Sequence, residues 1–199
     1  MVAQVGSQTL PNGADALAVA ADVTKEQDVD RLFGAIAEQV GPLDILINNA
    51  GAGIYGEVWK LTPADFDLVM AANARSTFLC ARKAMDTMIP RKSGYIINIS
   101  SVVGFKGYAK QGAYAAAKHA VMGITKVLAV EAQPLGIRVS AILPGAVDTD
   151  FIRAARPDLK PAELLGPEDI AATVAYLLSL SDRAAVDEIY IRRRNSQPF

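Results

Sequence analysis

Short apolar runs alternate with helical patterns from residue 16 to residue 192. The apolar runs that we predict as strands are 16–21, 43–48, 95–99, 137–142 and 188–192. Strands that alternate with helices form parallel sheets with both faces covered. We therefore predict an α/β fold built on a doubly wound parallel sheet, whose ligand crevice lies at the carboxyl ends of the strands.

Four helices are predicted between these strands. The first has apolar residues at helical spacing from Val29 to Val40, behind a capping-box pattern at Thr24–Gln27. The remaining three are predicted from Thr62-Pro63 toward Met88, over about 112–132, and from near Pro167. Threonine followed by proline is a common helix start, because it caps the first turn and presets the backbone.

Composition limits the kinds of partner. The chain has 199 residues, 51% of them hydrophobic, which suits one domain over residues 1–199. Its net charge of -1 gives no general attraction to nucleic acid or to an anionic membrane, so we predict a small-molecule partner.

There is no membrane-length apolar stretch and no signal-peptide pattern at the start, which predicts a cytoplasmic protein. We predict no metal site, and the one cysteine, Cys80, has no partner for an internal disulfide.

Tyr114 and Lys118 stand four residues apart in a predicted helix, which places them on one face. A charge about 4 Å from the phenol, at an effective dielectric constant of about 20, contributes roughly 4 kcal/mol. That energy could lower the pKa of a tyrosine from about 10 toward about 7, the range that suits a general acid or base. Taken alone, such a pair is usually an ordinary surface contact between residues four apart on a helix.

Further polar and glycine residues follow the other predicted strands. Ser101 follows 95–99, Asn48-Asn49-Ala50-Gly51 ends 43–48, and Pro144-Gly145 follows 137–142. Together with Tyr114 and Lys118, in this order and spacing, they resemble the short-chain dehydrogenase/reductase family of the classical type. The resemblance implies a Rossmann-like fold.

The resemblance also implies a reaction and its residues. It implies NAD or NADP as cofactor and a carbonyl compound or secondary alcohol as substrate, with these catalytic residues: Asn73, Ser101, Tyr114 and Lys118. Tyr114 would transfer the proton, Lys118 would lower its pKa and bind the nicotinamide ribose, Ser101 would bond the substrate oxygen, and Asn73 would hold a water. The implied cofactor-binding residues are Asp22, Val23, Asn48, Ala50, Gly51, Tyr114, Lys118, Pro144, Gly145, Val147 and Thr149. A homodimer or homotetramer, formed through the helices that carry Asn73 and Tyr114, is implied as well.

One element of the family pattern is missing from the sequence. The family normally opens with a strand, a TGxxxGxG turn and a helix, and none of these precedes Ala16. We therefore expect an N-terminally truncated Rossmann-like domain whose opening is a loop or a short helical remnant. The run Gly51–Gly56 matches GxGxxG, but it does not lead directly into a helix, so we interpret it as a loop.

Two interpretations of function stay open at this point. The filled Asn-Ser-Tyr-Lys set favours an oxidoreductase, whereas the missing glycine turn favours a catalytically silent relic or interaction module. Three aromatic residues, Tyr55, Trp59 and Tyr108, could line the substrate pocket or simply pack. We interpret His119 as a polar surface or interface residue, and the run Arg192–Arg194 as a solvated tail.

Overall fold

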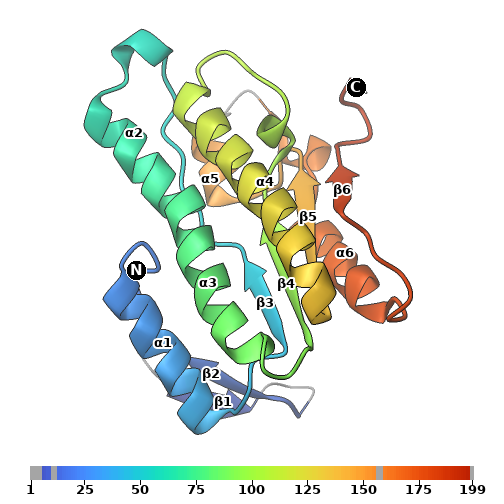
Figure 1. Ribbon diagram of the computed structural model, residues 1–199. Coiled ribbons are helices and arrows are strands. Elements are labelled where there is room, and N and C mark those ends of the chain that lie inside the picture. Colours follow the sequence, from blue (N-terminus) through green and yellow to red (C-terminus); the bar gives the residue numbers. More distant parts are fainter. Residues whose placement is uncertain (1–5, 10–12, 156–158, 198–199) are drawn as a thin grey trace.

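A computed structural model describes residues 6–9, 13–155 and 159–197 of the chain. Four parallel strands form its main sheet, in the order β3-β4-β5-β6 (Figure 1). Their bounds are Ile45–Asn48 (β3), Gly94–Ile99 (β4), Ile137–Pro144 (β5) and Glu188–Ile191 (β6). The helices are Glu26–Gln39 (α1), Pro63–Met70 (α2), Ser76–Met88 (α3), Gly112–Ala132 (α4), Asp150–Ala155 (α5) and Pro167–Ser179 (α6). The predicted α/β fold with a parallel sheet is confirmed.

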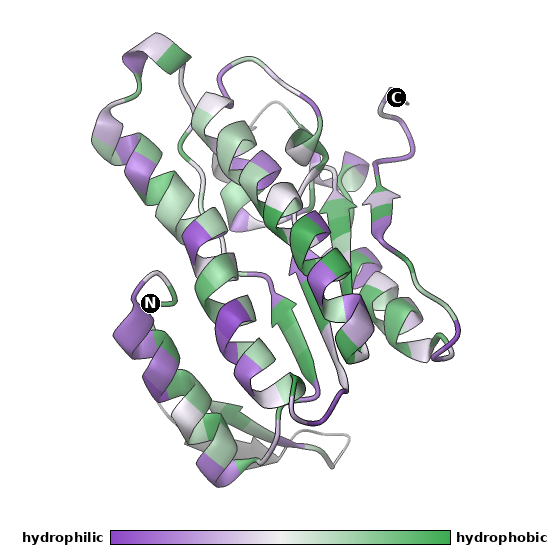
Figure 2. Ribbon diagram, in the orientation of Figure 1, coloured by the Kyte–Doolittle hydropathy of each residue, from purple (hydrophilic) through white to green (hydrophobic). Residues whose placement is uncertain are grey.

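Alternate residues of the central strands face opposite helical layers. Ile96 packs into a cluster with residues of α1 and α3, whereas Tyr95 and Ile97 pack with Leu177 of α6. Figure 2 shows the hydrophobic colouring of β3 and β5. β5 is buried along most of its length, whereas Ile45 and Ile47 of the edge strand β3 are 41% and 43% exposed. Each fully buried isoleucine contributes roughly 1.5 to 3 kcal/mol, so this pattern holds the strand ends in place below the site.

The first predicted strand does not join the parallel sheet. Residues Asp15–Ala18 (β2) instead pair with Gly6–Thr9 (β1) as a separate antiparallel ladder. The preceding segment therefore supplies the backbone partners of β2 locally, and β3 forms the edge of the described sheet. The prediction of a loop or helical remnant at the opening is wrong for Gly6–Thr9.

Of the two side-chain helix caps that we predicted, at Thr24 and Thr62, one forms. Thr62 caps α2, and its side chain and that of Asp65 form the reciprocal bonds of a capping box. The box predicted at Thr24 does not form, because the Asp22 carboxylate accepts hydrogen bonds from the backbone N–H and the hydroxyl of Thr24. The cap position of helix α1 is instead Lys25, one residue later, and it makes no side-chain capping bond.

The long helix that we predicted from Thr62 to Met88 is interrupted. A π turn at Ala71–Arg75 joins α2 to α3. No helix among the described residues is long and apolar enough to cross a bilayer. The cytoplasmic location stays a prediction.

Candidate active site

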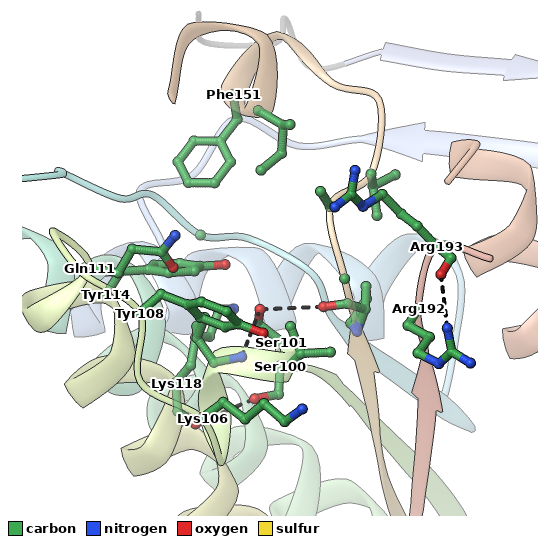
Figure 3. Close-up of a pocket in the computed structure, with 18 of the residues that line it drawn as sticks. Ser100, Ser101, Lys106, Tyr108, Gln111, Tyr114, Lys118, Phe151, Arg192 and Arg193 are labelled. Atoms are coloured by element: carbon green, nitrogen blue, oxygen red, sulfur yellow. Dashed lines mark hydrogen bonds between the residues drawn. The ribbon is translucent and has the colours of Figure 1, made fainter. Parts of the chain in front are cut away.

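One cavity of about 970 Å³ opens at the carboxyl ends of the four parallel strands (Figure 3). It is also bordered by α4, by the π turn and by α5. The predicted site residues that line it are Gly51, Asn73, Ser101, Tyr114, Lys118, Pro144, Gly145, Val147 and Thr149. Residues from distant parts of the sequence thus meet at one edge of the sheet.

Four of the predicted cofactor-binding residues lie outside this cavity. Asp22 is engaged with Thr24, and those hydrogen bonds lower the pKa of its carboxyl group. Val23, Asn48 and Ala50 line a smaller cavity of about 160 Å³, together with residues of α1 and α3. These four positions do not line the larger cavity, although Asn49, beside two of them in the sequence, lines both cavities.

Helix α4 presents Tyr114 and Lys118 one turn apart. The Lys118 side chain is buried, and its Nζ donates a hydrogen bond of 2.9 Å to the carbonyl oxygen of Ile99. The same nitrogen lies 5.7 Å from the centre of the Tyr114 ring. Burial lowers the pKa of Lys118 to about 8.

The pKa of Tyr114 moves in the opposite direction to our prediction. Burial raises it to about 12, and the nearby Ser101 hydroxyl only partly opposes this rise. The Tyr114 ring lies 5.9 Å from the ring of Tyr55 and 5.8 Å from that of Phe151, centre to centre. We predicted a value near 7 from the charge of Lys118 alone. In the structure the loss of water around the phenol is the larger effect.

Ser101 is held at the end of β4 by local hydrogen bonds. Its hydroxyl accepts from the backbone N–H of Val103 at 3.3 Å and so caps the short 3-10 helix Val102–Gly104. The same hydroxyl donates to the carbonyl oxygen of Pro144 at 3.4 Å, at the end of β5. Both contacts are long, which leaves the hydroxyl able to exchange them for a ligand.

Asn73 lies in the π turn and is 1% exposed. Its Nδ2 donates to the carbonyl oxygens of Ala52 and Val69, at 2.7 and 2.8 Å. Its Oδ1 is buried and has no hydrogen-bond partner within the described chain. A β-carbon added to Gly51 would lie 2.7 Å from this oxygen and 3.7 Å from Lys118 Nζ. The absence of a side chain at Gly51 thus keeps open the space beside both groups.

Two of the three aromatic residues that we considered for the substrate pocket line the cavity. Tyr55 and Tyr108 line the cavity, whereas Trp59 is 82% exposed and does not. Burial raises the pKa of Tyr55 above its usual value. His119 is exposed on α4, with its Nδ1 2.9 Å from the carbonyl oxygen of Ala115, in accord with a surface position.

The sequence interpretation missed several residues of the cavity wall. Phe151 of α5 packs against Tyr55 and Tyr114. Lys106 lines the cavity, and so do Arg192 and Arg193, which we had interpreted as part of a solvated tail. Their position in the sequence could have indicated this role. Arg192 ends the strand predicted at 188–192, and this fold binds its ligand at the carboxyl ends of the parallel strands.

The comparisons with known proteins agree with this geometry. The family model described as "short chain dehydrogenase" matches residues 1–160. A 3-oxoacyl-(acyl-carrier-protein) reductase of Synechocystis sp. is 35% identical over 178 residues, covering 87% of this chain and 72% of the relative.

Two solved structures are similar in fold. A levodione reductase superposes with a TM-score of 0.85 at 35% identity, covering 91% of this chain and 77% of the other. The protein ElxO, solved with NADP bound, superposes with a TM-score of 0.78 at 28% identity, covering 86% and 74%. Together with the family match, these likenesses show that the chain belongs to the short-chain dehydrogenase family of oxidoreductases.

Proposed function

We propose that this protein is an NAD(P)-dependent oxidoreductase that reduces a carbonyl group or oxidises a secondary alcohol by hydride transfer. One observation carries the proposal: Asn73, Ser101, Tyr114 and Lys118 come from the π turn, the end of β4 and helix α4, and all four line one cavity. Oxidoreductase relatives support the proposal over a silent relic or interaction module.

The residues present fit the nicotinamide end of such a cofactor. The Lys118 ammonium has three donors, one of which bonds to the carbonyl oxygen of Ile99, while Asn73 Oδ1 is a buried acceptor beside it. Gly51 leaves room for ribose hydroxyl groups next to both. Pro144, Gly145, Val147 and Thr149 would border the ring, and the bound cofactor would supply or accept the hydride. The structure of ElxO with NADP bound supports a nicotinamide dinucleotide as the cofactor. The choice between NAD and NADP stays open.

Tyr114 is proposed as the proton donor to the carbonyl oxygen. Because burial raises its pKa to about 12, the phenol keeps its proton at neutral pH until a strong base forms next to it. An alkoxide that develops from a carbonyl is such a base. The Ser101 hydroxyl would donate a second hydrogen bond to the same oxygen, and the charge of Lys118 would stabilise the phenolate that remains.

The test measures NADH and NADPH oxidation by the full chain with a panel of ketones and aldehydes. We expect Tyr114→Phe to lower the rate by at least about 100-fold, the usual contribution of a positioned acid. Tyr176→Phe is the matched control, because Tyr176 is 52% exposed on α6, away from the cavity. Equal rates for Tyr114→Phe and the parent would contradict the proposal.

We also propose that the chain forms a homodimer or homotetramer through α3 and α4. Large apolar side chains stand exposed on these helices: Phe78 at 48%, Val127 at 58% and Val130 at 73%. Light scattering should show an oligomer that Val130→Glu weakens. Val40→Glu, at a position 69% exposed beyond the end of α1, should leave the oligomer unchanged, and a monomeric parent at micromolar concentration would contradict the proposal.

A further inference from the structure

The cavity wall is positively charged although the chain as a whole is not. Four basic residues line it, Lys106, Lys118, Arg192 and Arg193, and no aspartate or glutamate does so within the described residues. The net charge of the chain is -1, so this excess is local. Two acidic residues lie between lining positions, and both pair with Arg153: Asp148 is bonded to it at 2.8 and 3.0 Å, and Asp150 forms an ion pair with it at 3.6 Å. A cleft lined by one sign of charge concentrates ligands of the other sign.

Arg192 uses its charge to shape the segment after β6. Its Nη1 donates to the carbonyl oxygens of Arg193, Arg194 and Ser196, at 3.2, 3.4 and 2.7 Å. The chain there curls around one guanidinium group, as Figure 3 shows in part for the bond to Arg193. Arg192 therefore acts as a positioning residue that sets the direction in which Arg193 leaves the strand.

Arg193 is the basic side chain left for a ligand. It is half-buried, and no ion pair found in the described part of the chain involves it. Its side chain reaches from the end of β6 toward the cavity (Figure 3). A β-carbon added to Gly145 would lie 3.8 Å from the Arg193 backbone nitrogen, so the segment after β6 runs beside the end of β5. The next strand of the sheet is β4, which leads to Ser101.

Lys106 approaches the same wall through an aromatic contact. The Phe105 ring meets the Tyr190 ring edge-on at 4.6 Å, and Tyr190 belongs to β6. Lys106 Nζ lies 5.6 Å from the centre of the Phe105 ring. The Phe105–Tyr190 contact thus joins the loop after β4, which carries Lys106, to the strand that directly precedes the arginines.

Given the oxidoreductase function proposed above, we propose that the substrate is a carbonyl compound with an anionic group, a carboxylate or a phosphate, which Arg193 binds with the help of Lys106. The planar guanidinium group matches both anions with two parallel N–H bonds. The cofactor is a second source of anionic groups, so the test must separate the two sources.

The test compares charged and neutral versions of one ketone. Acetoacetate is paired with methyl acetoacetate, and dihydroxyacetone phosphate with dihydroxyacetone. For at least one pair we expect Arg193→Gln to lower kcat/KM for the anion by about tenfold or more and to change it by less than about threefold for the neutral partner. Arg194→Gln is the matched control, because its side chain is exposed and does not line the cavity. It should change neither rate.

Other outcomes overturn the proposal without touching the proposed function. If Arg193→Gln raises KM for NADH or NADPH equally with both members of a pair, the arginine binds the cofactor instead. If the parent turns over neutral and anionic ketones, and Arg193→Gln changes kcat/KM equally for both members of each pair, Arg193 does not bind the anionic group of the substrate. If nothing is turned over, the oxidoreductase proposal fails, and calorimetry with the two anions decides: binding that weakens in Arg193→Gln supports the anion site, and equal or absent binding overturns it.

Discussion

The ammonium nitrogen of Lys118 lies 2.9 Å from the carbonyl oxygen of Ile99 and donates a hydrogen bond to it. Because Ile99 ends β4 and Lys118 is on α4, this bond fixes the helix against the strand that leads to Ser101. The same burial that secures the bond lowers the pKa of Lys118 to about 8. The burial of Lys118 therefore affects both the position of α4 against β4 and the pH dependence of stability.

The first prediction concerns stability between about pH 8 and pH 10. With the pKa of Lys118 at about 8 in the folded chain and 10.5 as its ordinary value, the unfolded chain holds a proton in this window that the folded chain has released. Stability therefore rises with pH here, by up to about 1.4 kcal/mol per unit, and below about pH 8 the full cost of burying the charge is present. Chemical denaturation at several pH values measures this slope.

Lys118→Met is the control for that slope. The methionine does not titrate, so the slope that Lys118 contributes should be absent in this variant, while the loss of the donor to Ile99 adds a cost that does not depend on pH. Other titrating groups, such as tyrosines above about pH 10, affect both proteins equally and cancel in the difference. Parallel pH profiles for the parent and the variant would show that Lys118 is charged in the folded chain throughout.

The second prediction concerns the space beside Asn73. A β-carbon at Gly51 would lie 2.7 Å from Asn73 Oδ1, closer than side-chain atoms approach. Gly51→Ala should therefore displace Asn73 from its bonds with Ala52 and Val69 and destabilise the chain by about 1 to 3 kcal/mol. It should also slow any turnover. Denaturation and steady-state kinetics measure the two effects.

Gly34→Ala provides the comparison for this glycine. Gly34 lies exposed in α1, and a β-carbon there meets nothing within 4 Å. Alanine in a helix interior should stabilise the chain by up to about 1 kcal/mol. The two glycine-to-alanine changes are thus expected to have opposite signs, and a neutral or stabilising Gly51→Ala would mean that Asn73 can move without cost.

Hydrophobic patterning predicted the central strand β4 because it is buried between two layers. Tyr95, Ile96 and Ile97 are all buried, which gives the continuous apolar run that distinguishes such strands. The run at 16–21 has similar composition, and composition alone does not reveal that Gly6–Thr9 will pair with it. Pairing is a tertiary property, so this strand was assigned to the wrong sheet.

In the site, too, the features set by neighbouring residues in the sequence were predicted, and those set by tertiary contacts were not. The spacing of Tyr114 and Lys118 on one helix is local and was predicted, but the pKa of Tyr114 depends on Tyr55 and Phe151, which reach it from other segments. The π turn that presents Asn73 has no sequence signature that we used. Arg193 was missed because a basic run at the end of a chain usually lies in solvent.

The last prediction concerns a buried chain of hydrogen bonds behind the site. Asn48 Nδ2 donates to Asn98 Oδ1 at 2.9 Å, and Asn98 Nδ2 donates to the Thr125 hydroxyl at 2.9 Å, so β3, β4 and α4 are joined through one fully buried amide. Asn98→Ala should cost about 2 to 4 kcal/mol, since it opens a cavity and leaves the Asn48 amide without its partner. Thr125→Val, which removes the hydroxyl's bonds with Asn98 and with the carbonyl oxygen of Val121 but opens no cavity, should cost less. A double-mutant cycle between Asn48→Ala and Asn98→Ala measures the coupling, and a coupling free energy of zero would show that the two amides stabilise the sheet independently.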